Sequence, residues 1–326
     1  MLRIGILGAA GIAPQAIIRP ASRRDDVVIA AVASRSEQSA IAYGQANAIP
    51  AAYGSYQALL DDDSIDLVYN ALPASEHARW SIAALESGKH VLCEKPIAMN
   101  AAEAEEMASA AARTGRRLIE AFHDRYHPLS EYLLGVRTSG ELGQLLSLDA
   151  AFTGSVPFDP ASIRHDPALG GGALMDLGCY PVHWVRFLVG EEPEVVTASY
   201  SPNPMGADET IEAMLRFPSG VEARVAASMA GKDTFRPSLV VEGTRGRLEV
   251  DNPLLPHRGH SVRITTNGVL RTLTIGGAET YDYQLDAVVK AILSREPLPT
   301  ESEDFVANMT TIDAIYRAAG LHRGRA

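Results

Sequence analysis

The sequence predicts an α/β protein of two domains: a doubly wound parallel sheet, then an α+β domain with a large, mostly antiparallel open sheet. Three observations lead to this prediction. The 326 residues match two domains of the usual size of about 150 residues. Over residues 1–122, short apolar runs alternate with helical patterns, which is typical of βαβ units. Over residues 123–326, closely spaced strands are separated by turn sequences, which is typical of antiparallel hairpins.

The first expected domain, residues 1–122, contains apolar runs of strand length. They are Leu2–Leu7, Val27–Ala33, Leu67–Ala71, His90–Cys93 and Leu118–Ala121. Helical stretches lie between them, and Asn100 and Gly115 are suited to begin and end one helix, Ala101–Arg113. Because crossovers between such strands are right-handed, we expect one parallel sheet.

The second expected domain, residues 123–326, opens with a helix near Leu129–Arg137 and a strand at Leu145–Phe152. A loop rich in proline and glycine, Ser155–Gly172, precedes a helix at Ala173–Val189. Further strands are expected at Val195–Ser201, Ile211–Phe217, Val221–Ser228, Leu239–Glu242, Arg247–Val250, Val262–Thr265 and Val269–Thr274. The helices Tyr281–Ser294 and Ser302–Ala319 follow, and we leave open that the C-terminal helix packs back on the first domain.

Composition excludes several classes of protein. Hydrophobic residues make up 46% of the chain and charged residues 21%, which is typical of a soluble globular protein. No apolar run reaches the roughly 18 residues of a membrane span, and the start is too short for a signal peptide, so we expect a cytoplasmic protein without membrane contacts. The net charge of −11 disfavours nucleic acid. Cys93 and Cys179 form neither a disulfide framework nor a zinc motif, so we expect no metal.

A glycine loop, Gly8-Ala9-Ala10-Gly11-Ile12-Ala13, follows the first strand and opens a helix. Gly8 permits a tight turn, Gly11 permits a pyrophosphate to approach the backbone, and Ala13 permits close helix–sheet packing. The free amides at the helix start would then hold the anion. This pattern predicts a Rossmann dinucleotide site with contacts from Gly8, Ala10, Gly11 and Ile12, and the alternative is a simple tight turn.

The end of the second strand bears on the choice of cofactor. An NAD site usually carries an acid here for the ribose 2′-hydroxyl, whereas this chain has Ser34 and Arg35, which suit a 2′-phosphate. We therefore expect NADP. Arg35 as a solvated surface charge is the alternative, and Glu37 keeps NAD possible as a ribose contact.

The turn Cys93-Glu94-Lys95-Pro96 lies at the carboxyl end of an expected parallel strand, where such sheets bind ligands. The chain has 25 arginines and only four lysines, and only lysine loses its proton in a useful pH range. A cationic cofactor ring nearby would lower the pKa of Lys95. Lys95 is therefore a candidate proton donor or hydroxyl anchor, with an ordinary surface lysine as the alternative.

Four motifs together carry a family resemblance. They are the GxxGxA loop, Pro73-x-x-x-His77, the block Gly88–Pro96 that ends in Glu-Lys-Pro, and the block Gly170–Gly178 that holds GGG and an aspartate. The chain resembles the glucose-fructose oxidoreductase / inositol dehydrogenase / rhizopine catabolism (Gfo/Idh/MocA) family over nearly its whole length. The resemblance implies NAD(P)-dependent hydride transfer on sugars, polyols or related alcohols. It also implies a homodimer or homotetramer formed through the C-terminal sheet.

The resemblance assigns roles to single residues. Lys95 would contact the reacting oxygen, and Glu94 would be a structural or cofactor-side partner. Leu72, Pro73 and His77 would lie at the cofactor, and for His77 the alternative is a satisfied residue at a helix end.

Spacings of four and three residues place Asp176, Tyr180 and His183 on one helical face. In much of the family the acid is followed by His and then Asp, so Tyr180 and His183 both depart from that pattern. With tyrosine at position 180, the chain resembles the branch of the family that contains glucose-fructose oxidoreductase, D-xylose dehydrogenases and dimeric dihydrodiol dehydrogenases. A phenol near a lysine ammonium and an oxidised nicotinamide has a lowered pKa, so Tyr180 is the expected base.

The remaining candidates concern the same helix and the substrate pocket. Asp176 would bind a neighbouring hydroxyl or orient Lys95, and His183 is a substrate contact or a packing residue. Pro181 lies inside the helix, and we expect a kink there.

His123 and Asp124 stand where the aldose-acting branch has Met and an aromatic residue, which would make the pocket more polar. Arg164 and His165, before the GGG segment, are possible hydroxyl contacts, and Arg164 as a solvated loop charge is the alternative.

Three functions stay open on the sequence. The first is an NADP-preferring dehydrogenase acting on a cyclic sugar, polyol or dihydrodiol, with Lys95 and Tyr180 handling the proton. The second is a reductase of a keto- or anhydro-sugar. The third is a non-catalytic NADP-binding regulatory protein, which the intact Lys95, Asp176 and Tyr180 disfavour.

Overall fold

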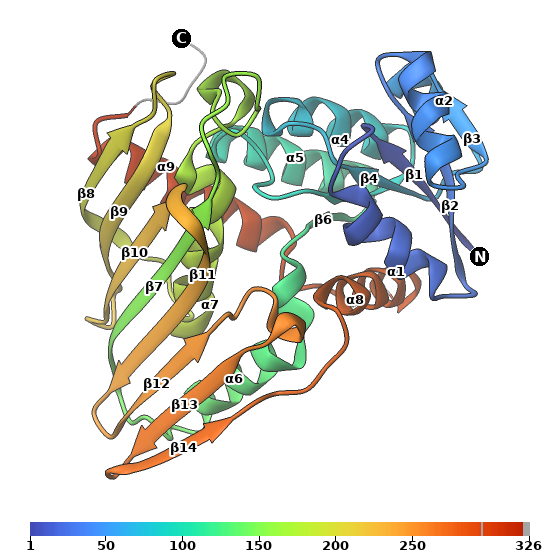
Figure 1. Cartoon of the computed structure of the whole chain (residues 1–326). Helices are drawn as coiled ribbons and strands as arrows, with labels where there is room; N and C mark the ends of the chain where they lie inside the picture. The colour runs from blue at the N-terminus through green and yellow to red at the C-terminus, as the bar shows by residue number, and fades with distance from the viewer. Residues whose placement is uncertain (295, 322–326) are drawn as a thin grey trace. The chain divides into compact units, whose positions relative to one another are not determined.

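The computed structural model describes residues 1–294 and 296–321, which form two compact units (Figure 1). The first unit consists of Met1–His123 and Tyr281–Val306, and the second of Asp124–Thr280 and the residues from Ala307 onward. The sequence-based division left residues 281–306 with the second domain. In the structure they join the first unit, because Leu285 and Val288 pack into its hydrophobic core. No described helix is both long and apolar enough to cross a membrane.

The first unit is built on a parallel sheet of strand order β3-β2-β1-β4-β5-β6 within the described residues. The strands are β1 (Leu2–Leu7), β2 (Val27–Ala33), β3 (Ala51–Tyr53), β4 (Leu67–Asn70), β5 (His90–Cys93) and β6 (Leu118–Glu120). β3 was not predicted, because its three residues, Ala51–Tyr53, are too few to give a strand pattern in the sequence. Leu7 is in register with both Ala33 and Asn70, and Asn70 with Cys93, so four strands end together.

Helices cover this sheet. They are η1 (Pro14–Ile18), α1 (Arg19–Ser22), α2 (Glu37–Ala46), α3 (Tyr56–Leu60), η2 (Ala74–Glu76), α4 (His77–Glu86), α5 (Ala101–Thr114) and α8 (Thr280–Ser294). The predicted ends of α5 are confirmed: the Asn100 side chain accepts the Glu103 amide hydrogen at 2.9 Å, and Gly115 has a φ of 64°. α8 is tied to the segment after α1 through ion pairs of Arg23 with Asp282 and Arg24 with Asp286.

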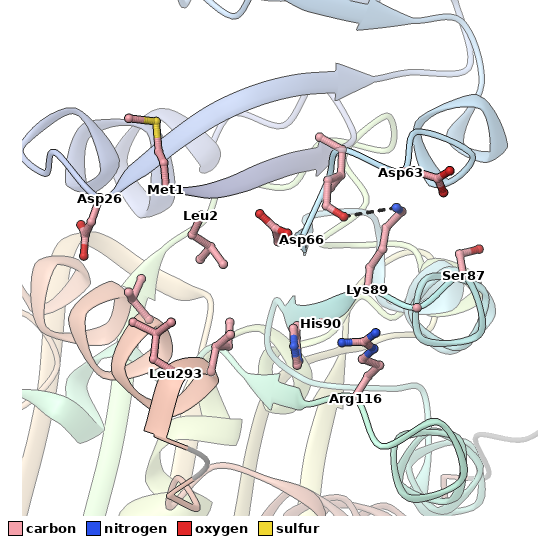
Figure 2. Close-up of a pocket in the computed structure, with 14 residues that line it drawn as sticks. Met1, Leu2, Asp26, Asp63, Asp66, Ser87, Lys89, His90, Arg116 and Leu293 are labelled. Atoms are coloured by element: carbon pink, nitrogen blue, oxygen red, sulfur yellow. Dashed lines mark hydrogen bonds between the residues drawn. The ribbon is translucent and has the colours of Figure 1, made fainter.

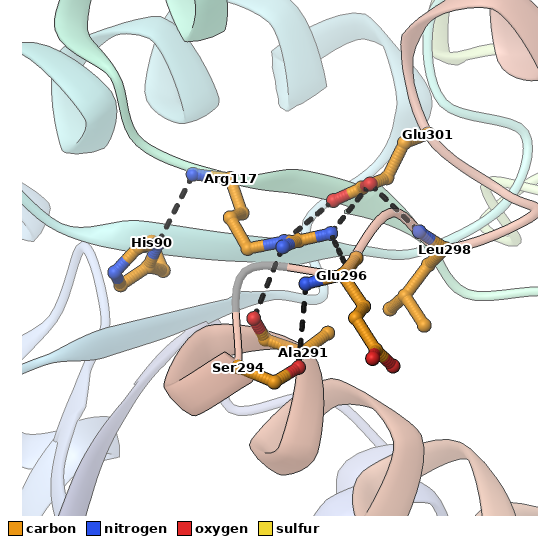
Figure 3. A network of polar contacts seen from close by, with 7 residues as sticks. All are labelled: His90, Arg117, Ala291, Ser294, Glu296, Leu298 and Glu301. Atoms are coloured by element: carbon orange, nitrogen blue, oxygen red, sulfur yellow. Dashed lines mark hydrogen bonds and ion pairs between the residues drawn. The ribbon is translucent and has the colours of Figure 1, made fainter.

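Arg117 fixes the chain that follows α8 (Figure 3). Its guanidinium donates to both Glu301 carboxylate oxygens, at 2.8 and 2.7 Å, and to the carbonyl oxygens of Ala291 and Glu296. Its backbone amide donates to Nδ1 of His90 at 3.0 Å. Arg117, which is largely buried, therefore holds the end of α8 and the start of the next helix against β5 and β6.

The second unit holds a sheet of order β14-β13-β12-β11-β7-β10-β9-β8 within the described residues. The strands are β7 (Leu145–Ser155), β8 (Glu194–Pro202), β9 (Asp208–Arg216), β10 (Glu222–Ser228), β11 (Ala230–Gly243), β12 (Gly246–Asp251), β13 (Ser261–Thr266) and β14 (Val269–Leu273). Neighbours pair antiparallel apart from the central pair β7 and β10, which is parallel. The predicted mostly antiparallel sheet is confirmed.

Helices α6 (Pro128–Thr138), α7 (Cys179–Val189) and the larger part of α9 (Ser302–Ala318) belong to the second unit, together with the short helices η3 (His123–Tyr126, mostly in this unit), η4 (Pro167–Leu169), η5 (Leu174–Gly178) and η6 (Pro256–Arg258). α7 packs against β7 and β10. Inward residues of β7 and β10 are buried, and the alternate residues of the other face are half-exposed.

The helix predicted at residues 173–189 begins with a π-turn, η5, in front of Pro181. The first helix of the chain repeats this arrangement, with the π-turn η1 in front of Pro20. Proline has no amide hydrogen and its ring clashes with the carbonyl four residues earlier. A wider turn before the proline accommodates both effects, and the kink expected at Pro181 stays a prediction.

Candidate active site

The glycine turn after β1 has the predicted geometry. Gly8 has a φ of 95°, which favours glycine, and its amide donates to the Ala33 carbonyl at 2.9 Å. A Cβ at Gly11 would meet no chain atom within 4 Å, so packing within the chain does not require glycine there. Ala10 accepts a hydrogen bond from the Tyr43 hydroxyl at 2.9 Å, and Ile12 is 36% exposed. Hydrogen bonds to Ala33 and from Tyr43 thus fix the backbone of the turn, and the space beside Gly11 is open.

Ser34 and Arg35 follow β2 directly beside this turn. The Ser34 amide donates to the Tyr53 carbonyl at 3.1 Å, and Ser36 caps α2 by accepting from the Ser39 amide. Arg35 is exposed, and among the described residues no carboxylate pairs with it. Its guanidinium is therefore available to an anionic ligand at this edge.

The segment after β4 is braced by two buried polar side chains. Asn70, fully buried, donates to the Ser81 hydroxyl at 3.0 Å and accepts from the Leu72 amide at 3.3 Å. The two ring nitrogens of His77 lie 2.8 and 2.9 Å from the carbonyl oxygens of Leu72 and Pro96. Burial lowers the pKa of His77, which is 1% exposed. His77 thus links the Leu72-Pro73 segment to the turn after β5.

Lys95 stands in that turn, half-buried, and the Lys95–Pro96 peptide bond is cis. The Tyr69 hydroxyl donates to Oε1 of Glu94 at 2.5 Å, and the Lys95 amide donates to Oε2 of Glu94 at 3.3 Å. Burial raises the pKa of Glu94, and the hydrogen bond from Tyr69 opposes this shift. Sequence reasoning missed Tyr69, since an apolar strand pattern gives no signal that one of its residues supports the next strand's turn.

The structure brings the first group of predicted residues together on one sheet edge. The glycine turn, Ser34-Arg35, the segment from Leu72 to His77 and Glu94-Lys95 follow β1, β2, β4 and β5, whose carboxyl ends are in register. β1 and β4 are neighbours that lead to opposite sides of the sheet, which is where such sheets bind ligands.

In the second unit, Asp176 lies in the π-turn η5, and Tyr180 and His183 lie on α7. The Asp176 side chain is 14% exposed, and its backbone amide donates to the Gly172 carbonyl at 2.9 Å. The Tyr180 ring contacts Phe152 and Trp184 at centroid distances of 6.3 Å, and His183 is 1% exposed. Because Asp176 sits in the wide turn, the α-helical spacing assumed between it and Tyr180 does not hold over the whole interval.

The structure places Arg164 beside Asp176 and buries His165, and the expected hydroxyl contact of Arg164 stays a prediction. Arg164 places Nε 3.3 Å from Oδ2 of Asp176, so it is an ion-pair partner and not an isolated loop charge. His165 is 1% exposed, its Nε2 lies 3.1 Å from the Pro157 carbonyl, and its own carbonyl accepts from Asn203 at 3.1 Å. His165 therefore braces the loop from inside and does not present its ring to a ligand.

His123 and Asp124, adjacent in the chain, belong to different units. His123 stacks on Tyr281 at a centroid distance of 4.1 Å, and Asp124 accepts a 2.7 Å hydrogen bond from Nε1 of Trp184. Both residues are 3% exposed, and burial raises the pKa of Asp124. Each side chain thus has a ring contact or a hydrogen bond within its own unit, and the expected polar pocket stays a prediction.

A cavity of about 600 Å³ lies at the opposite edge of the first unit's sheet (Figure 2). Its lining includes Leu2, Asp66, Lys89 and His90, at or just before the amino ends of β1, β4 and β5. Lys89 donates to the Asp62 carbonyl at 2.7 Å. None of the predicted site residues is among its described lining residues, so this cavity is separate from the candidate active site.

A doubly wound parallel sheet with a glycine turn after its first strand defines the Rossmann class of nucleotide-binding fold, and comparison with known families specifies the protein family. The oxidoreductase family with an NAD-binding Rossmann fold matches residues 2–122, and the GFO/IDH/MocA C-terminal domain matches residues 135–249. The chain belongs to the Gfo/Idh/MocA oxidoreductase family. The resemblance inferred from the motifs is confirmed, and NAD(P) is the cofactor class of the first unit.

Similar proteins span the length of the chain. It is 38% identical to D-xylose 1-dehydrogenase (NADP(+)) 2 of Haloferax volcanii over 98% of this chain and 97% of the relative. It is 34% identical to trans-1,2-dihydrobenzene-1,2-diol dehydrogenase of Macaca fascicularis, over 77% of this chain and 75% of the relative. A 3-ketoreductase of Actinomadura kijaniata in complex with NADP and TDP-benzene superposes with a TM-score of 0.90 at 28% identity, covering 97% of each chain.

Proposed function

We propose that the protein is an NADP-preferring dehydrogenase that transfers hydride between nicotinamide and a hydroxyl-bearing carbon of a cyclic sugar, polyol or dihydrodiol. One observation carries the proposal: Lys95 and the open glycine turn at Gly8 and Gly11 lie at the same edge of the sheet. Lys95, whose amide donates to Glu94, stands where a parallel sheet binds its ligand. The xylose and dihydrodiol dehydrogenases among the relatives act on substrates of this kind.

The dinucleotide would be held by Gly8, Ala10, Gly11 and Ile12, with Ser34 and Arg35 on a 2′-phosphate. When bound, it supplies a nicotinamide ring that accepts or donates a hydride. Lys95 would polarise the reacting oxygen, and Tyr180 would take the hydroxyl proton. Asp176 would bind a neighbouring hydroxyl or orient Lys95. His77 would act on the cofactor side through the carbonyl oxygens of Leu72 and Pro96, since its ring nitrogens face them.

A reductase of a keto-sugar is the second candidate, and the relatives support it. The chain is 35% identical to dTDP-3,4-didehydro-2,6-dideoxy-α-D-glucose 3-reductase of Streptomyces antibioticus over 81% of this chain and 79% of the relative. The residues proposed for proton transfer serve both directions, because the same groups donate and accept the proton. The direction of turnover separates the two candidates.

The test is a turnover assay that follows reduced nicotinamide, first with NADP and then with NAD. The substrates are pentoses, hexoses, inositols and a trans-dihydrodiol; NADPH with keto-sugars follows. We expect Lys95→Met to lower kcat by about 10²–10⁴-fold and to leave the cofactor Kd nearly unchanged. Retained turnover in Lys95→Met would overturn the assignment. Tight NADP binding without turnover in either direction would instead support the regulatory protein.

We further infer a homodimer or homotetramer formed through the uncovered face of the second unit's sheet. Ala151 and Ala226 lie on this face, half-exposed, beside Arg224, which pairs with Asp149 and Glu212. Small residues and paired charges permit a second sheet to approach closely. Light scattering of the wild type and of Ala226→Glu tests the surface, and an unchanged mass in the variant would argue against it.

A further inference from the structure

We propose that Arg164 is a positioning residue that fixes the orientation of the Asp176 carboxylate. The inference rests on the proposed function, in which Asp176 contacts the substrate. Nε of Arg164 lies 3.3 Å from Oδ2 of Asp176, and the two side chains are 51% and 14% exposed. An ion pair with one half-exposed partner adds little to stability, so the proposal concerns the orientation of the carboxylate and not the stability of the fold.

The backbone that carries Arg164 is closed onto the segment that begins the helix. The Gly172 amide donates to the Arg164 carbonyl at 2.9 Å, and the Gly171 amide donates to the Asp166 carbonyl at 2.8 Å. A Cβ at Gly171 would lie 2.7 Å from the carbonyl carbon and oxygen of Arg164. Glycine is therefore required at this contact, and the loop and the helix start form one unit of structure.

A buried side-chain brace holds the other side of the loop. His165, next to Arg164, faces inward and is 1% exposed. Its ring approaches the Pro157 carbonyl, and Asn203, 5% exposed, donates to its backbone carbonyl. The backbone at Arg164 is thus fixed by contacts on both sides. A fixed backbone reduces the conformational freedom of the long side chain attached to it.

Asp176 lies in the segment onto which this loop closes. It belongs to the π-turn η5, directly before α7. Its backbone amide donates to the carbonyl of Gly172. The preceding residue, Gly171, is the one that lies against the Arg164 backbone. The same short segment therefore sets both the Asp176 backbone and the Arg164 guanidinium that aligns its carboxylate.

The alternative is that Arg164 binds the substrate itself, and a comparison of kcat with KM distinguishes the two roles. If Arg164 acts through Asp176, Arg164→Gln lowers kcat by about 10- to 100-fold, while KM and the cofactor Kd change little. Arg164→Lys restores part of kcat, because a cation remains beside the carboxylate. A raised KM with unchanged kcat in Arg164→Gln would overturn the proposal.

A second test needs no assumption about the size of the effect. In Arg164→Ala, added guanidinium chloride at millimolar concentration should raise kcat above the value with matched sodium chloride, whereas the wild type should not respond. Combining Arg164→Gln with Asp176→Asn should lower kcat no further than Asp176→Asn alone, because one residue acts through the other. Independent, multiplying effects together with absent rescue would overturn the proposal.

The controls separate this inference from the proposed function. Arg216→Gln removes an equally half-exposed arginine, 49% exposed and paired with Glu222, from the same unit and should leave kcat unchanged. Thermal unfolding of each variant verifies folding. Retained turnover in Lys95→Met would overturn the proposed function. Lost turnover in Lys95→Met together with wild-type kcat in Arg164→Gln would overturn only the role of Arg164.

Discussion

The hydroxyl of Tyr69, in β4, donates a 2.5 Å hydrogen bond to Glu94, the residue before Lys95 at the end of β5. Tyr69 is fully buried, and its strand neighbour in β5 is Leu92. The carboxylate that receives this bond also accepts the Lys95 amide hydrogen. The backbone of the candidate catalytic lysine is therefore supported by the adjacent strand.

Replacing Tyr69 with Phe should lower the free energy of unfolding by roughly 1–3 kcal/mol, because a buried carboxylate loses a donor. Burial already raises the pKa of Glu94, and loss of the Tyr69 hydrogen bond raises it further. The folded state then binds the proton of Glu94 more tightly, so the loss grows with pH. Urea unfolding of the wild type and of Tyr69→Phe at pH 5 and pH 8 measures this loss in the free energy of unfolding. Tyr53→Phe is the control and should cost less, because the Tyr53 hydroxyl bonds to Asp62, which is only half-buried. An equal loss at both pH values for Tyr69→Phe would contradict the argument.

The anchoring of the segment after α8 predicts a large effect at Arg117. Arg117 and Glu301 are 14% and 18% exposed, and Arg117→Met leaves Glu301 without its cation. We expect a loss of about 2–4 kcal/mol. Arg113→Met breaks the exposed pair with Glu86 and should cost less than about 1 kcal/mol. Denaturant unfolding of the two variants gives the comparison, and similar losses would refute it.

His90 should make the protein less stable in acid. Burial and the nearby Arg116 and Arg117 lower the pKa of His90 to about 4, against 6.5 for the unfolded chain. The neutral form stabilises the folded state above pH 6.5, and this contribution is lost as the pH falls from 6.5 towards 4.

Since His90 is partly exposed, we expect its share to be roughly 1–2 kcal/mol. His90→Asn retains an acceptor for the Arg117 amide and should give a shallower decline of stability between pH 7 and pH 4.5. A decline as steep as that of the wild type would exclude His90 as a cause. His127, whose pKa is also lowered to about 4, remains in this variant and accounts for a residual slope.

Arg35 should decide the preference between NADP and NAD. It is exposed beside the glycine turn, and among the described residues no carboxylate competes for it. Arg35→Ser should weaken NADP binding by about 10- to 100-fold and change NAD binding little, because only NADP carries the 2′-phosphate. Arg79→Ser, an arginine exposed on α4, serves as the control. Titration of both cofactors gives the ratio of the Kd for NAD to the Kd for NADP. If Arg35→Ser leaves this ratio unchanged, Arg35 is a surface charge without a role in cofactor choice.

Much of the first unit was predictable because its signals are local. β1, β2 and β5 begin and end at the predicted residues, since each is a largely apolar run followed directly by a glycine or a polar residue. The left-handed turn at Gly8 and the cap at Asn100 follow from the preferences of single residues. Short motifs likewise placed Lys95 after β5 and Asp176 at a helix start.

The contacts that support these residues were not predictable. Arg164 pairs with Asp176, Asn203 braces His165, and Trp184 holds Asp124, each across a stretch of chain that no periodicity connects. The parallel pairing of β7 with β10 and the transfer of residues 281–306 to the first unit escaped prediction for the same reason.

The sequence by itself determined the fold class, most strands of the first unit and the family, because apolar period, turn residues and motifs are properties of neighbouring residues. Only the tertiary structure decided which polar side chains are buried braces, such as His77 and His165, and which stand at the surface, such as Arg35. Burial and hydrogen-bond partners arise when distant segments pack, and a buried polar group must find its partner there.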